Sequence, residues 1–282
     1  MLVKPATRQK TETRQDVSEA AAAATGKSHG VRVAEFPATK DAHRNFLLRS
    51  IPDEEYAQLR PHLEQLRYET LDLLVEAGET HRYVYFPETS VVSVVRRMRD
   101  GALIEAGTVG REGMAGLGAL LGSAWSQSTL TTQVPGLCVR MPFDVAAERF
   151  QELPTLRSLL QRFTLSFIDQ IGQAVACNGR HSLVRRCARW LLSAHDRTDG
   201  DTFVLTHDVL AQMLAVRRAG VTEAAGALKA KGLIKYSRGR IVVKDSAGLE
   251  EAACECYAIN RENIARLMGG DAIFHATTHA VV

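Results

Sequence analysis

The chain has 282 residues, of which 45% are hydrophobic and 24% are charged. This length predicts two domains, and this composition excludes wholesale disorder. No run of about 18 apolar residues is present, which argues against a membrane-spanning helix. The N-terminus lacks the apolar core of a secretory signal, so no such signal is expected. Five scattered cysteines without a Cys-x-x-Cys pair predict the reducing cytoplasm rather than a disulfide scaffold.

The formal charge of +3 is unevenly distributed. Residues 180–244 hold thirteen Lys/Arg and five Asp/Glu side chains, whereas residues 41–179 hold thirteen and seventeen. A basic block on an otherwise acidic chain is typical of a module that binds a polyanion, although a solvated basic face is the alternative.

Residues 1–40 hold few large apolar side chains, which predicts a mobile arm. Residues 41–152 begin with a short helical segment, because Pro52 and three acidic residues favour a helix start. Short β-rich runs separated by turn residues follow, and their spacing of about ten residues predicts a β-barrel or β-roll. The candidate strands are Leu71–Val75, Tyr83–Phe86, Val91–Val95, Leu103–Ala106 and Leu137–Met141.

Residues 153–180 change to a helical period. One apolar stripe carries Leu156, Leu160, Phe163, Phe167 and Ile171. A stripe on a long helix leaving a β domain needs a partner, which is either its own domain or the same helix of a second chain. Periodicity leaves both open.

Residues 181–250 predict helices followed by a small hairpin. An amphipathic helix over Leu183–Ala194 precedes Thr206, a good N-cap for a helix over 207–214. A tight turn leads to a second helix that ends at Lys231-Gly232, and a two-stranded hairpin with Ser237–Gly239 at its turn follows. Two short helices and a hairpin make a winged helix–turn–helix.

The second helix of this pattern opens with Arg217 and Arg218, which can bond guanine edges in the major groove. Thr222 and Glu223 lie one turn later, near the same face, where Glu223 can accept from a cytosine amino group or pair with a nearby arginine. Phosphate contacts are predicted for Lys229, Lys235, Arg238 and Arg240.

Residues 44–257 resemble the Crp/Fnr superfamily of bacterial transcription regulators. The resemblance depends on Gly78-Glu79, Val84–Pro87, Gly110–Gly113 and the spacing of 206–243. It implies an α+β fold: an N-terminal β-roll of the jelly-roll or double-stranded β-helix type, a long dimerisation helix and a C-terminal winged helix–turn–helix domain. It also implies a homodimer in which the stripe of Leu156, Leu160, Phe163, Phe167 and Ile171 faces the second chain, with residues 251–282 forming a C-terminal helix and tail.

The resemblance implies an effector pocket at Glu112, Gln127 and Ser128. Members that bind cyclic nucleotides carry an arginine where this chain has Gln127. Glutamine cannot neutralise a phosphate, so we expect an effector other than cAMP and predict no cofactor. No cysteine precedes Cys138, which excludes the N-terminal iron–sulfur cluster of oxygen-sensing relatives, and His81 alone is a weak haem candidate.

Cys254 and Cys256 need two further ligands to hold a metal, and His275 and His279 are the nearest histidines that follow them. Buried cysteines on a C-terminal helix are the favoured interpretation, so no metal is predicted. The chain contains no phosphate-binding loop, nucleophile elbow or identifiable acid–base pair, so no enzyme is predicted.

The sequence therefore predicts a cytoplasmic, homodimeric, sequence-specific DNA-binding transcription regulator. Its expected partners are double-stranded DNA and a second copy, with RNA polymerase as a further candidate and no membrane. The alternative is a cyclic-nucleotide or small-molecule sensor whose helical domain contacts protein rather than DNA. A steep salt dependence of DNA binding separates the two hypotheses.

Overall fold

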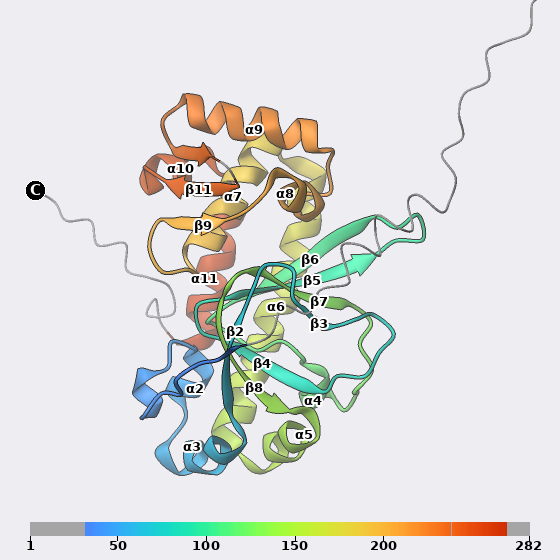
Figure 1. Ribbon diagram of the computed structural model, residues 1–282, viewed down its shortest axis with the longest axis vertical. Coiled ribbons are helices and arrows are strands. Elements are labelled where there is room, and N and C mark those ends of the chain that lie inside the picture. Colours follow the sequence, from blue (N-terminus) through green and yellow to red (C-terminus); the bar gives the residue numbers. More distant parts are fainter. Residues whose placement is uncertain (1–31, 238, 270–282) are drawn as a thin grey trace, which may run out of the picture.

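The structure is a computed structural model that describes residues 32–237 and 239–269. A β-roll occupies one half of the molecule and a helical domain the other, and helix α6 (Pro154–Arg180) extends from the first to the second (Figure 1). The α+β fold expected from the sequence is confirmed. Much of the predicted arm, Arg238, His275 and His279 lie outside the described residues.

The β-roll consists of two four-stranded antiparallel sheets. The first has the order β1 (Arg32–Val33), β2 (Glu64–Tyr68), β8 (Gly136–Pro142) and β4 (Tyr83–Pro87). The second has the order β3 (Leu73–Val75), β7 (Thr129–Val134), β5 (Val91–Arg97) and β6 (Leu103–Val109). The core between the sheets includes Leu66, Val84, Phe86, Val92, Leu130, Val139 and Met141. Strand β1 pairs with β2, so residues 32 and 33 of the predicted arm belong to the roll.

Short helices pack on the β-roll and add apolar side chains to its core. They are η1 (Lys40–Ala42), α2 (Phe46–Ser50), α3 (Asp53–Leu59), η2 (Arg60–His62), α4 (Gly118–Leu121) and α5 (Phe143–Glu152). Helix α3 starts after Pro52, as its acidic first turn predicts.

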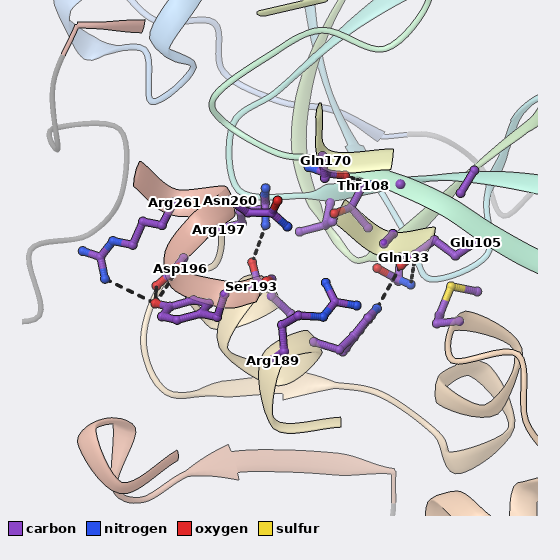
Figure 2. Close-up of a pocket in the computed structure, with 18 of the residues that line it drawn as sticks. Glu105, Thr108, Gln133, Gln170, Arg189, Ser193, Asp196, Arg197, Asn260 and Arg261 are labelled. Atoms are coloured by element: carbon purple, nitrogen blue, oxygen red, sulfur yellow. Dashed lines mark hydrogen bonds between the residues drawn. The ribbon is translucent and has the colours of Figure 1, made fainter. Parts of the chain in front are cut away.

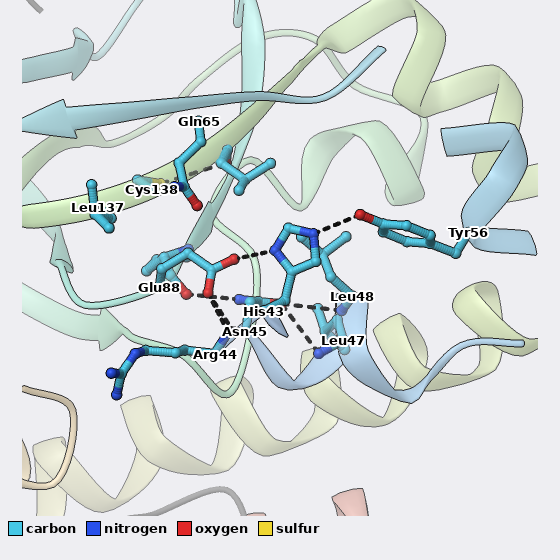
Figure 3. A network of polar contacts seen from close by, with 12 residues as sticks. His43, Arg44, Asn45, Leu47, Leu48, Tyr56, Gln65, Glu88, Leu137 and Cys138 are labelled. Atoms are coloured by element: carbon cyan, nitrogen blue, oxygen red, sulfur yellow. Dashed lines mark hydrogen bonds and ion pairs between the residues drawn. The ribbon is translucent and has the colours of Figure 1, made fainter. Parts of the chain in front are cut away.

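A buried polar network attaches residues 43–45, between η1 and α2, to the roll (Figure 3). The imidazole of His43 bonds Glu88 at 2.6 Å through Nδ1 and the Tyr56 hydroxyl at 2.8 Å through Nε2. The backbone N–H groups of Arg44 and Asn45 donate to the same carboxylate. Every polar group of this network therefore has a partner, which offsets the cost of burying it.

Helix α6 buries the predicted stripe in its own chain. Leu156, Leu160 and Phe163 are at most 2% exposed and belong to the core of the roll. The prediction that these three form a dimer face is wrong, because their surface is already covered within one chain. Phe167 packs against the same core, and Ile171 is partly buried.

A different face of α6 remains open. Leu165, Ile168 and Val175 are 50%, 59% and 70% exposed, and Gly172 lies between them on the same side. Their spacing of three and seven residues places them on one helical stripe.

The helical domain begins with α7 (Leu183–His195), and β9 (Thr202–Val204) follows. Next come α8 (His207–Met213), α9 (Arg218–Ala230), β10 (Ile234–Ser237) and β11 (Arg240–Val243). The predicted helices and hairpin match these bounds within one or two residues. Strand β9 adds a third, unpredicted strand beside β11, in the order β10-β11-β9.

The last two helices return to the roll. Helix α10 (Ser246–Ala252) packs on α7, and α11 (Cys256–Met268) lies beside α6 (Figure 1). Tyr257 of α11 belongs to the core of the helical domain, whereas Ile264 and Met268 belong to the core of the roll. Helix α11 therefore ties the two domains together.

Within the described residues, no helix is both long enough and apolar enough to cross a bilayer.

Candidate nucleic-acid interface

Helices α8 and α9 meet through a tight turn. Thr206 caps α8 by accepting a bond from the Val209 N–H at 3.2 Å. Ala215 adopts the left-handed conformation with φ of 52°, and the Val216 N–H bonds the Ala211 carbonyl at 3.0 Å. The facing apolar side chains are buried, and they include Val209, Leu210, Leu214, Val221, Ala225 and Leu228. This packing fixes the direction in which α9 leaves the domain.

The predicted DNA contacts belong to α9 and the hairpin of the helical domain. Helix α9 forms the outer edge of the molecule, away from the roll (Figure 1). The exposed residues among those predicted are Arg217, Arg218, Thr222, Glu223, Lys229, Lys235 and Arg240. They belong to the start and end of α9 and to the hairpin, so every predicted contact that the structure describes is open to solvent.

Local bonds orient the first turn of α9. Arg218 lies 3.4 Å from Asp208, with both side chains more than 60% exposed, so this pair holds the guanidinium only weakly. Thr222 bonds His207 at 3.0 Å, and the His207 ring stacks on Tyr236 of the hairpin at 4.2 Å. Burial, with the positive charge of Arg218, lowers the pKa of His207. His207 thus joins helix and hairpin, a role that its sequence position gave no reason to expect.

Glu112, predicted to line an effector pocket, instead forms a buried ion pair with Arg197. The shortest contact, Nη2 to Oε1, is 2.9 Å, and the two side chains are 5% and 0% exposed. The Gly110 N–H donates to the same carboxylate at 3.0 Å. Arg197 follows the end of α7, so the pair connects the roll to the helical domain.

Two glycines of the segment Gly110–Gly113, which follows β6, allow it to approach its neighbours closely. A Cβ at Gly110 would lie 2.4 Å from the Arg197 side chain, and one at Gly113 would lie 2.0 Å from the Phe163 ring. Any larger residue at either position would displace the ion pair or α6. The Gly110–Gly113 motif therefore builds a contact between domains.

The other predicted pocket residues lie elsewhere. Arg96 of β5 donates to the Gln127 carbonyl at 2.5 Å and reaches the Ser128 hydroxyl at 3.5 Å. Gln127 is exposed, whereas Glu112 is fully buried against Arg197. Within the described residues, no hydrogen bond or ion pair joins Glu112 to Gln127 or Ser128, because Glu112 is paired with Arg197.

A small cavity lies where β5, β6 and β7 face α6, α7 and α11 (Figure 2). Glu105 is its central carboxylate and accepts bonds from Trp190 at 3.0 Å, Gln133 at 2.9 Å and Ser93 at 2.7 Å. The volume of the cavity is about 50 Å³. It can hold a few water molecules but is too small for a nucleotide.

The Glu105 carboxyl makes stability depend on pH. Burial raises the pKa of Glu105, against the opposing bonds from Ser93, Trp190 and Gln133. In the unfolded chain Glu105 has an ordinary pKa of about 4.3, so it loses its proton at a lower pH than in the folded protein. The free energy of unfolding therefore falls as pH rises from about 4.3 through the higher pKa of the folded state.

We expect wild type to lose stability relative to Glu105→Gln across that interval, because the amide does not ionise. Urea unfolding of both proteins at a series of pH values measures this difference. A difference that stays constant with pH, or that grows in favour of wild type, would contradict the assignment.

The chain matches two family models. Residues 65–152 match the cyclic nucleotide-binding domain, and residues 185–252 match the Crp-like helix-turn-helix domain. A comparison with curated proteins found no match.

Solved structures share the fold at low identity. A CRP-family transcriptional regulator from Thermus thermophilus is 23% identical with a TM-score of 0.52, and the match covers 66% of this chain and 95% of that one. The c-di-GMP-responsive global regulator CLP from Xanthomonas campestris is 14% identical with a TM-score of 0.54, covering 68% and 99%. FixK2 from Bradyrhizobium japonicum is 13% identical with a TM-score of 0.54, covering 68% and 98%.

The matched segments coincide with the two halves of the molecule. Residues 65–152 cover most of the β-roll, and residues 185–252 cover α7 to α10 with the hairpin. With a cyclic nucleotide-binding domain followed by a Crp-like helix-turn-helix domain, in the fold of CRP-family regulators, the chain belongs to the Crp/Fnr superfamily of transcription regulators.

Proposed function

We propose that this protein is a sequence-specific DNA-binding transcription regulator that acts as a homodimer. The observation that carries the proposal is the basic start of α9, where Arg217 and Arg218 are both exposed. Helix α9 itself lies at the outer edge of the molecule (Figure 1). Arginine at the start of a recognition helix can make paired bonds to guanine in the major groove.

Each predicted contact has a separate role in this proposal. Arg217 and Arg218 face base edges, and Thr222 and Glu223 complete the base-reading side of α9. Lys229, Lys235 and Arg240 contact phosphates, which set the affinity for any duplex rather than the choice of sequence.

DNA binding is tested by titrating salt. A protein that neutralises several phosphates releases counterions, so log K should fall linearly with log salt, with a slope of about −0.9 for each phosphate contact on duplex DNA. Fluorescence anisotropy with a labelled duplex measures this slope. Affinity that does not change with salt, or no binding at low ionic strength, would favour a domain that contacts protein.

The open face of α6 supports the homodimer. Leu165, Ile168 and Val175 present an apolar stripe along a helix that no described element covers on that side. A second copy of the same helix buries such a stripe symmetrically, because a two-fold axis pairs identical surfaces. It also presents α9 twice, as a two-fold-related operator requires.

We expect Ile168→Glu to shift the chain from dimer to monomer, because a charge at the centre of an apolar interface lacks a partner. Sedimentation velocity over a range of concentrations measures the shift. Glu148→Ala, at a site on α5 outside this stripe, is a control that should remain dimeric. A dimer of unchanged affinity in Ile168→Glu would place the interface elsewhere.

The effector is not assigned. Glu112 is occupied by Arg197, and Gln127 stands at the position expected to hold a phosphate-binding arginine. These two observations support control by something other than cAMP.

A further inference from the structure

Four potential metal ligands lie close together between the end of α6 and the start of α11. Cys177 lies in the last turn of α6, and His181 follows that helix directly. Cys254 follows α10, and Cys256 is the first residue of α11. One ligand atom from each of the four lies within 4.8 Å of those of the other three.

The distances suit a tetrahedral ion. The Cys177 and Cys254 Sγ atoms are 3.5 Å apart, and the Cys256 Sγ is 3.5 Å from Nδ1 of His181. Ligand atoms around tetrahedral zinc, with Zn–S bonds of about 2.3 Å, are separated by about 3.8 Å. Small side-chain movements would bring all four to bonding distance.

The cluster is enclosed. The three cysteines are at most 2% exposed and form a small core cluster of their own. The His181 side chain is 10% exposed. A closed set of four protein ligands, without an open position for substrate, is typical of a structural site rather than a catalytic one.

Neighbouring groups support the ligands in the way known for metal sites. Nε2 of His181 lies 3.1 Å from the Glu255 carboxylate, which leaves Nδ1 directed at the sulfur atoms. A histidine ligand commonly donates its other N–H to a carboxylate in this manner. The Gln173 amide donates to the Cys256 sulfur at 3.0 Å.

Charge in the surroundings fits an anionic centre. Three thiolates and one neutral imidazole around a divalent cation carry a net charge of −1. The positive charges of Arg186 and Arg189 both act on thiols of this cluster. The Nε atoms of both arginines are buried without a hydrogen-bond partner among the described residues.

We propose that Cys177, His181, Cys254 and Cys256 bind one divalent transition-metal ion, and that zinc is the ion. Three sulfur ligands and one nitrogen in a closed tetrahedral set select zinc over magnesium or calcium, which prefer oxygen. The bound ion joins the end of α6 to the start of α11, the helix that reaches the cores of both domains. It therefore holds the helical domain against the roll.

The sequence alone predicts no metal, and the nearest histidines that follow Cys254 and Cys256 are His275 and His279. The structure supplies Cys177, in the last turn of α6, and His181, the residue directly after that helix. No sequence spacing connects them with Cys254, which is 77 residues from Cys177.

Elemental analysis of the full chain, purified under reducing conditions without chelator, tests the proposal. We expect one zinc per chain. After the ion is removed, cobalt should restore a one-to-one complex with the visible absorption of tetrahedral thiolate-bound Co²⁺. Chelation should lower the melting temperature, and added zinc should restore it.

Variants distinguish a ligand from a merely buried thiol. Cys254→Ser and Cys256→Ser should lose the bound zinc, and Glu255→Gln should bind it about 10–100-fold more weakly. His181→Cys should retain zinc, because a thiolate replaces the imidazole. Cys187→Ala is the matched control: Cys187 is buried in the helical domain, where burial raises the pKa of its thiol to about 12, and its loss should leave the zinc content unchanged.

Three results would overturn the proposal. The first is reduced wild-type protein that holds no metal and takes up neither zinc nor cobalt. The second is a Cys177–Cys254 disulfide in the protein as isolated, shown by titrating the free thiols. The third is purified protein that contains iron and inorganic sulfide, which would indicate an iron–sulfur cluster instead of zinc. None of these results bears on whether α9 binds DNA.

Discussion

Replacing Arg197 by methionine is expected to lower the free energy of unfolding by about 3–5 kcal/mol, the largest loss that we predict for a single substitution. The variant leaves the Glu112 carboxylate buried without the countercharge of Arg197, and within the described part of the chain it keeps the hydrogen bond from the Gly110 N–H. Urea unfolding followed by tryptophan fluorescence measures the loss. Trp190 lies at the contact between the domains and reports on it directly.

The double variant Arg197→Met/Glu112→Gln should recover much of this loss, because both charges are then absent. Glu152→Gln is a matched control, since its partner Arg149 and its own side chain are 29% and 48% exposed. Its effect should stay within about 1 kcal/mol. Equal effects of Arg197→Met and Glu152→Gln would show that the buried pair does not hold the domains together.

Replacing Arg218 by alanine is expected to reduce discrimination between operator and unrelated DNA by about 1–3 kcal/mol, because one paired bond to a base is lost. Lys235→Ala should instead weaken binding to both DNAs alike and reduce the salt slope by about one phosphate contact. Anisotropy titrations with an operator and a scrambled duplex measure both effects.

Arg67→Ala is the control for this pair, because Arg67 is an exposed arginine on β2 of the roll. It removes the same charge without touching α9, so operator preference should not change. If Arg218→Ala behaves like Arg67→Ala, then Arg218 does not read a base.

Local patterns predict the helical domain well. Thr206 at the N-cap, the apolar faces of α8 and α9, and Gly232 after α9 are all encoded within a few residues of the element that they define. The predicted bounds therefore agree with the structure within one or two residues.

The β-roll was predicted less completely. Strand β7 carries Thr132 and Gln133 at 1% exposure, and strand β2 carries Glu64, Gln65 and Arg67. Neither shows the apolar runs that mark a strand, because polar side chains occupy several positions of both. Two of these side chains have partners on other strands: Glu64 pairs with Arg140 of β8, and Gln133 donates to Glu105 of β6. Such partners are distant in sequence and leave no local pattern.

The stripe on α6 shows a second limit. The helical spacing of its apolar residues predicts that one face of α6 is covered, but it does not identify the covering element. In the structure the roll of the same chain covers Leu156, Leu160 and Phe163. The Glu112–Arg197 pair joins residues 85 positions apart. Contacts of this kind depend on how the domains pack and become visible only in three dimensions.

Selection of bound sequences from random duplex DNA tests the central claim most directly, because it requires both α9 in the groove and two copies of the chain. We predict enrichment of two half-sites related by a two-fold axis, with centres about one helical turn apart, roughly 34–36 Å. Recovery of no common sequence, or of a single half-site without its symmetric mate, would contradict the account.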